Sequence, residues 1–129
     1  MSNSNDLYRE ELMDIYKDPS NKRRLKNATL SVDEKNPICG DALNLQLEIE
    51  KGVIKEAAFE GSACFVSIVS SEILTEHIAG KTVEEAKKLT KEDLLEMLNL
   101  NLTTSRIQCA ALILVALQKA LANYGKEKR

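Results

Sequence analysis

The sequence is short of metal-binding and cross-linking residues: three cysteines and one histidine stand among 129 residues, and no paired C-x-x-C knuckle is present. An odd cysteine count leaves one thiol unpaired in any disulfide framework, and structural zinc sites usually show such knuckles. A large excess of charge of one sign is also lacking, because the net charge is only −2. Composition therefore gives no reason to expect nucleic acid or an anionic membrane as a partner.

Long apolar runs and a secretory leader are missing as well. No apolar run reaches the length that a membrane-spanning helix needs, and the first residues, 1–6, lack the basic start and apolar core of a signal peptide. We therefore expect a cytoplasmic protein without a membrane partner, in a compartment that disfavours disulfides. With 43% hydrophobic and 29% charged residues, the composition is that of one globular domain spanning residues 1–129.

The hydrophobic pattern predicts an α+β fold. Alternating apolar residues predict strands over about 28–32, 43–50 and 53–59, the second being the clearest and the third the least regular. Helical spacing and capping signals predict helices over residues 6–17 and 64–78, two short helices after Thr82 and Thr90, and a last helix over about 104–124. The expected architecture is a three-stranded antiparallel sheet with helices packed on one side.

One short stretch, Asn36-Pro37-Ile38-Cys39-Gly40-Asp41, places a thiol and a carboxylate two residues apart on a turn. A hairpin brings its outer ends together, so Cys64, which follows the third strand, is predicted to lie near Cys39. Cys64 and Cys109 both fall in the first or second turn of a predicted helix, and a helix N-terminus stabilises a thiolate. The topology therefore favours convergence of Cys64 with Cys39 and Asp41, and the position of Cys109 near a helix start makes it a further candidate for metal or sulfur chemistry.

Three thiolates and the Asp41 carboxylate provide four ligands, the number that tetrahedral zinc takes, and thiolates also hold iron–sulfur clusters. A carboxylate oxygen exchanges more readily than a fourth thiolate, so such a site is expected to be labile. The alternative is that the cysteines pack in the core as small apolar residues. Spacing alone leaves both interpretations open.

Five segments taken in order resemble the IscU/SufU/NifU-N-terminal family of iron–sulfur cluster assembly scaffolds. They are the Asn36–Asp41 turn, Phe59-Glu60-Gly61-Ser62-Ala63-Cys64, Gly80-Lys81-Thr82, Arg106-Ile107-Gln108-Cys109, and the N-terminal segment from Leu7 to Asn21, which is similar to the SufU-type branch. The resemblance covers almost the whole chain. Each motif is short, and their ordered set makes the resemblance specific.

The resemblance implies a carrier rather than an enzyme with its own turnover. A pyridoxal-phosphate cysteine desulfurase would deliver sulfur as a persulfide, and the scaffold would combine it with iron into a transient [2Fe–2S] cluster for apo-proteins. Carried over by position, the ligands are Cys39, Asp41, Cys64 and Cys109. The persulfide acceptor would be Cys109, as in IscU-type members, or Cys39, as in SufU-type members, where zinc occupies the resting site.

Three features depart from one branch or the other. Gln108 stands where IscU-type proteins carry histidine, and residues 102–106 lack the proline and lysine of the chaperone-recognition segment. The gap between Cys64 and Cys109 has no room for the SufU-type insertion. Two rivals to the scaffold therefore stay open: a zinc-dependent persulfide acceptor working with a desulfurase, and a domain whose zinc only stabilises the fold.

Three further residues are candidates for minor roles. Arg106 lies one helical turn before Cys109, where it could hold thiolate charge, contact the desulfurase or form a surface salt bridge. His77, late in its helix, is expected at the surface. Tyr8 is expected to pack in the fold, although N-terminal tyrosines of the family can mediate self-association, so a homodimer is a further expectation.

Overall fold

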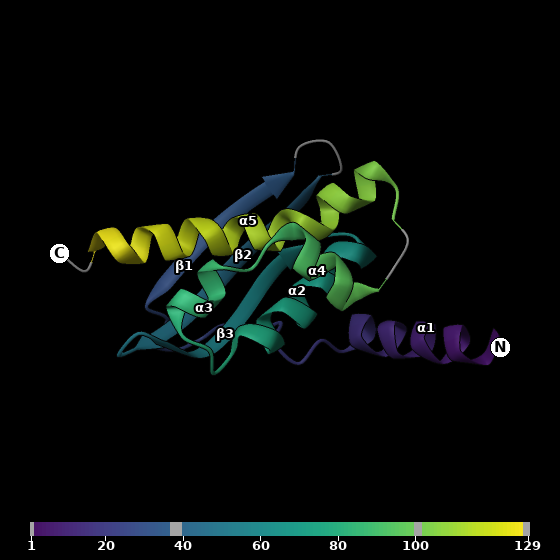
Figure 1. Cartoon of the computed structure of the whole chain (residues 1–129), viewed down its shortest axis with the longest axis horizontal. Coiled ribbons are helices and arrows are strands. Elements are labelled where there is room, and N and C mark those ends of the chain that lie inside the picture. The colour runs from purple at the N-terminus through teal and green to yellow at the C-terminus, as the bar shows by residue number, and fades with distance from the viewer. Residues whose placement is uncertain (1, 37–39, 100–101, 128–129) are drawn as a thin grey trace.

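The computed structural model describes residues 2–36, 40–99 and 102–127, with the side chains of residues 2–9, 105 and 125–127 left out (Figure 1). In chain order the elements are α1 (Ser2–Lys17), β1 (Leu30–Asn36), β2 (Asp41–Glu50), β3 (Val53–Ser62), α2 (Phe65–Ile78), α3 (Val83–Lys87), α4 (Lys91–Leu98) and α5 (Thr104–Glu127). Figure 1 shows the helices that follow the sheet gathered over one of its faces, while α1 projects from the body of the molecule.

The three strands form one antiparallel sheet in the order β1-β2-β3, which confirms the predicted fold class. At its centre Leu45 of β2 pairs with Val32 on one side and Phe59 on the other. The alternating leucines of β2 are buried, because every second side chain of a strand points to the covered face. The predicted first strand over 28–32 was placed too early, since β1 begins at Leu30 and continues to Asn36.

A break in register explains why β3 alternates imperfectly. Glu48 pairs with Glu56, but the next residue of β2, Ile49, pairs with Ile54, so Lys55 is an extra residue in β3. Such a bulge shifts the side-chain alternation by one residue. Ile54 and Phe59 therefore both reach the core, although their odd spacing in the sequence would place them on opposite faces.

Helices α2 and α5 cover the apolar face of the sheet, α5 lying over β1 and β2 and α2 over β3. By length and composition alone, residues 106–124 of α5 could cross a membrane, with mean hydropathy 1.3, so the expectation that no segment reaches that length was wrong. Half of this stretch is buried inside the fold. A central core helix has the same apolar composition because it packs on several sides.

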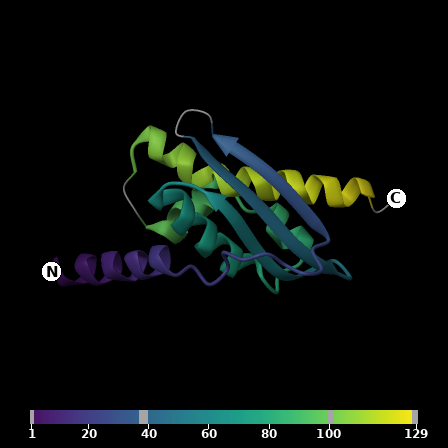
Figure 2. The same ribbon diagram turned by 180° about the vertical axis from the view of Figure 1, so that it is seen from behind.

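The segment between α1 and β1 crosses the opposite face of the sheet (Figure 2). Its Asn21 carbonyl accepts a hydrogen bond from the Phe59 amide at 2.9 Å, and the Leu25 amide donates to Gln46 Oε1 at 2.7 Å. Gln46 is 4% exposed and donates to Asn44 and Glu60 in turn. These bonds fix the segment across β2 and β3, so that only part of the outer face is open to solvent.

Glu72 of α2 accepts a 2.8 Å hydrogen bond from the Asn21 amide while 8% exposed. Burial, with smaller contributions from the charges of Glu76 and Asp18, raises the pKa of Glu72 above its usual value. A raised pKa in the folded state means that the folded protein holds this proton more tightly than the unfolded chain does. The contribution of Glu72 is therefore favourable in acid and is lost as pH rises through the folded-state pKa.

The substitution Glu72→Gln is consequently expected to raise the melting temperature at pH 7, because glutamine keeps the acceptor for Asn21 without the buried charge. The gain should shrink as pH is lowered and the wild-type carboxyl becomes protonated. Thermal unfolding at pH 7 and pH 4 measures this difference. Glu96→Gln, on an exposed residue of α4, is the control, and an equal shift in both variants would contradict the explanation.

Candidate functional site

Asp41 is placed by the turn that joins β1 to β2. Gly40 has a positive φ of +75°, and its amide donates to the Asn36 carbonyl at 2.8 Å, which returns the chain toward β1. Asp41 then begins β2, pairs with Asn36 and is only 4% exposed. Cys39, predicted as a ligand and as a persulfide acceptor, lies outside the described residues.

The approach of Cys64 depends on Gly61 at the end of β3. Gly61 has a φ of +139° and lies so close to β2 that a Cβ there would clash with the Ala42 carbonyl oxygen. Only glycine adopts this backbone conformation without strain. The pairing of Ala42 with Ser62 continues to the end of the strand, so Cys64 emerges beside Asp41 two residues later.

Cys64 is the N-cap residue of α2, and its own backbone is held by Asp41. The Cys64 amide donates to Asp41 Oδ1 at 2.9 Å, while the Cys64 carbonyl accepts the first helical bond, from Ile68 at 3.0 Å. The carboxylate therefore takes one of the N–H groups that a helix start leaves without an internal partner. Asp41 thus has a structural role at the start of α2 that its place in the sequence motif did not indicate.

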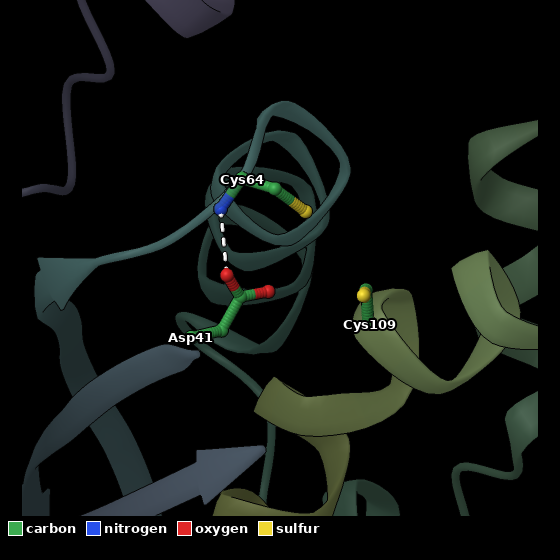
Figure 3. Close-up of side chains that lie close together, drawn as sticks. All are labelled: Asp41, Cys64 and Cys109. Atoms are coloured by element: carbon green, nitrogen blue, oxygen red, sulfur yellow. Dashed lines mark hydrogen bonds between the residues drawn. The ribbon is translucent and has the colours of Figure 1, made fainter. Parts of the chain in front are cut away.

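The third member of the cluster, Cys109, comes from the second turn of α5 and is 4% exposed. Its sulfur, the Cys64 sulfur and a carboxylate oxygen of Asp41 all lie within 4.8 Å of one another (Figure 3). Figure 3 shows the three side chains arriving from three different elements. The structure thus brings together three of the four ligands expected from the sequence.

Ser67 belongs to the same cluster, and the sequence reasoning missed it. Its hydroxyl, fully buried, donates to Asp41 Oδ2 at 2.6 Å and to the Cys109 carbonyl at 2.9 Å, and lies 3.6 Å from the Cys64 sulfur. The available signal was its spacing: residues three apart on a helix share one face, so a serine at 67 lies above a cysteine at 64.

The donor set fits a soft or borderline metal ion. Two thiols and a carboxylate carry negative charge when deprotonated, and a cation between them offsets their repulsion. In tetrahedral zinc with Zn–S bonds of about 2.3 Å, donor atoms lie about 3.8 Å apart, so the present spacing needs only a small contraction. Sulfur ligands also suit iron, whereas Mg²⁺ and Ca²⁺ prefer oxygen alone.

The remaining predicted residues lie outside this cluster. Arg106 is exposed in the first turn of α5, and Gln108 is exposed beside the buried Cys109. His77 is exposed near the end of α2, as expected. The side chain of Tyr8 lies outside the described part of the chain, whereas the α1 residue Tyr16 packs against Phe65 with 5.2 Å between ring centroids.

Comparison with known proteins gives a consistent result. The sequence model of the NifU-like N terminal domain matches residues 7–129. The zinc-dependent sulfurtransferase SufU of Bacillus subtilis is 33% identical, over 94% of this chain and 93% of that protein. The iron–sulfur cluster assembly scaffold protein IscU of Escherichia coli K12 is 33% identical, over 95% of this chain and 96% of that protein.

A solved structure supports the fold as well. The crystal structure of FiSufU from Fervidobacterium islandicum AW-1, which is described as an iron–sulfur cluster assembly scaffold protein for the SUF system, superposes with a TM-score of 0.74 at 25% identity. The superposed region covers 87% of this chain and 94% of the FiSufU chain. With its three antiparallel strands, its convergent cysteines and a family match over nearly its whole length, the chain belongs to the NifU-like N-terminal domain family that includes the IscU and SufU proteins.

Proposed function

We propose that this protein is a scaffold on which an iron–sulfur cluster is assembled from iron and from sulfur supplied by a cysteine desulfurase, and from which the cluster passes to apo-proteins. The observation that carries the proposal is the convergence of Asp41, Cys64 and Cys109 within 4.8 Å in a member of this family. Cys39 would be the fourth ligand. The protein would work in the cytoplasm as a carrier without catalytic turnover of its own.

The geometry suits a cargo that is held and then released. The carboxylate and Cys109 are each 4% exposed, which shields the bound ion or cluster from water on that side, while Cys64 is half-buried. Thiolates are the strong ligands for iron, and the Asp41 oxygen is the weak one. An incoming thiolate of an apo-protein would therefore take the place of Asp41 first, which starts the transfer without breaking an iron–sulfur bond to the scaffold.

Sulfur would arrive by thiol exchange. A scaffold thiolate attacks the outer sulfur of the desulfurase persulfide, a new S–S bond forms on the scaffold, and the desulfurase cysteine leaves as a thiolate. Cys109 and Cys39 are the candidate acceptors. Because Cys109 is only 4% exposed, acceptance there requires a movement of the surrounding structure that gives the desulfurase access to its sulfur.

A second candidate function is supported by the similarity to a zinc-dependent sulfurtransferase. In this alternative, zinc rests on the same ligands and leaves when a cysteine takes sulfur from the desulfurase. The exposed Gln108, in place of a histidine ligand, favours it. A zinc that only stabilises the fold is the third alternative, and it predicts that removal of the metal unfolds the protein.

One experiment separates these functions. Anaerobic mixing with ferrous iron, cysteine, a cysteine desulfurase and a thiol reductant, which takes the persulfide sulfur to sulfide, is expected to give the charge-transfer absorption bands of a [2Fe–2S] cluster. In a parallel mixture without iron and without the added reductant, mass spectrometry after thiol trapping should show persulfide on Cys109 or Cys39. Cys→Ser variants at positions 39, 64 and 109 identify the acceptor. A persulfide without absorption bands, in a protein that keeps tight zinc, would favour the sulfurtransferase. No persulfide on any cysteine would refute both.

A further inference from the structure

Ser67 contacts all three described ligand residues. It lies one helical turn after Cys64 in α2, with no exposed surface. Its hydroxyl reaches the Asp41 carboxylate, the backbone of Cys109 and the sulfur of Cys64, at 2.6, 2.9 and 3.6 Å. The strand, the helix start and the second helix that supply the ligands are thus joined at one buried oxygen atom.

The distances rank these contacts. At 2.6 Å, the bond to Asp41 is in the range of a charge-assisted O–H···O⁻ bond, the strongest kind that a hydroxyl forms. The Cys109 carbonyl lies within α5, where carbonyls already accept from the amide four residues later, so Ser67 adds a second bond there. A hydroxyl has one proton, and Asp41 and Cys109 share it as alternative acceptors.

Both carboxylate oxygens of Asp41 accept a hydrogen bond. Oδ1 accepts from the Cys64 amide and Oδ2 from Ser67, so the plane of the carboxylate is fixed rather than free to rotate. An ion that takes Oδ2 would leave the Ser67 proton with the Cys109 carbonyl as its partner. The hydroxyl therefore keeps a hydrogen bond in either state and stays satisfied although fully buried.

We propose that Ser67 is a positioning residue that presets Asp41, Cys64 and Cys109 for metal binding. The inference rests on the proposed function, because it takes these residues as ligands. Ser67 does not itself bind the ion. It holds the carboxylate plane and the α2–α5 spacing, which lowers the reorganisation that the ligands undergo when an ion binds. Loss of a hydrogen-bond partner that orients a ligand typically weakens metal affinity about 10–100-fold.

Ser70 provides a matched control. It is equally buried, lies one turn further along α2 and donates a 2.6 Å hydrogen bond to a backbone carbonyl of α5, that of Ala110. This bond does not involve a ligand residue. Ser67→Ala and Ser70→Ala therefore each remove one buried hydroxyl from the same interface, and only the first removes a contact with Asp41.

The test is titration of the reduced, metal-free protein with Co²⁺, whose d–d bands report coordination number and geometry and whose thiolate charge-transfer bands report the sulfur ligands. We expect Ser67→Ala to weaken Co²⁺ binding about 10–100-fold and to change the d–d bands. Ser70→Ala should stay within about twofold of the wild type with unchanged bands, because its hydrogen bond reaches Ala110 and no ligand residue. Apo-protein melting temperatures should fall similarly in both.

Each outcome bears on a specific claim. If the wild-type chain binds no Co²⁺, the proposed function and the role of Ser67 fail together. If the wild type binds and the two alanine variants bind equally well, only the role of Ser67 is refuted. If Ser67→Ala does not fold, Ser67→Thr replaces it, because threonine keeps the hydroxyl and is expected to keep the wild-type bands. A folded threonine variant with altered bands and weak binding would overturn the inference.

Discussion

Gly61→Ala is expected to destabilise the protein by roughly 3–5 kcal/mol, since it combines backbone strain with a steric clash. The residue has a φ of +139°, and the new Cβ would meet the Ala42 carbonyl oxygen and the Leu43 Cα, both in the neighbouring strand. Neither atom belongs to a flexible side chain. Relief would require β2 and β3 to separate at the end that places Cys64 next to Asp41. Chemical denaturation measures the stability, and Co²⁺ titration should show loss of binding.

Gly52→Ala is the matched control for this prediction. Gly52 also has a positive φ, +78°, but it lies in the β2–β3 turn, and a Cβ there would have no atom within 4 Å. Its substitution should cost only the strain of the left-handed conformation, about 1–2 kcal/mol. Similar losses in the two variants would mean that strain alone, rather than the close approach of the strands, makes glycine necessary at position 61.

Asp41→Ala is expected to change the stability of the fold and the lifetime of the cluster in opposite directions. The apo-protein should lose roughly 2–4 kcal/mol, because the Cys64 amide and the buried Ser67 hydroxyl both lose a charged acceptor. A reconstituted cluster should nevertheless persist several times longer, because the proposed release begins with exchange of the Asp41 oxygen and alanine removes that step. Denaturation of the apo-protein and the decay of cluster absorption, with and without an apo-acceptor, measure the two effects.

Asp33→Ala controls for the loss of one negative charge. Asp33 lies exposed in β1 and accepts a hydrogen bond from Asn44, away from the cysteines. Both the stability and the cluster lifetime should stay close to the wild type in this variant. A cluster that decays faster in Asp41→Ala than in the wild type would show that Asp41 retains the cargo instead of helping its release, and would contradict the carrier mechanism proposed above.

Much of the fold was accessible from the sequence because its strongest signals are local. The leucine alternation of β2, the Lys51–Gly52 turn and the capping boxes at Thr82 and Thr90 depend on neighbours only a few residues apart, and all are present in the structure. The extension of β1 to Asn36 was missed because its second half, residues 33–36, is polar. That half is a strand by virtue of its pairing with β2 rather than by its own composition.

The site was predicted less completely, for a physical reason that Asp41 and Ser67 illustrate. A ligand type and its spacing can be seen in a sequence, so Cys64, Cys109 and Asp41 could be proposed as neighbours. The hydrogen bonds of Asp41 to the α2 backbone and to Ser67 join residues 23 and 26 positions apart, and no periodicity encodes such a contact. The bulge at Lys55 and the crossing of the outer face by the segment at Asn21 escaped prediction for the same reason.

The different chain separations within the site also set an order in which it assembles during folding. Asp41 and Cys64 are joined through a hairpin that closes by short turns, 23 residues apart, whereas Ser67 meets Cys109 across 42 residues that include α3 and α4. The longer closure carries the larger entropic cost, about 0.6 kcal/mol for each doubling of loop length, and non-local contacts form later as a rule. We therefore expect the hairpin and α2 to form half of the site first and the docking of α5 to complete it, an order that φ-value analysis of variants in β3 and α5 would test.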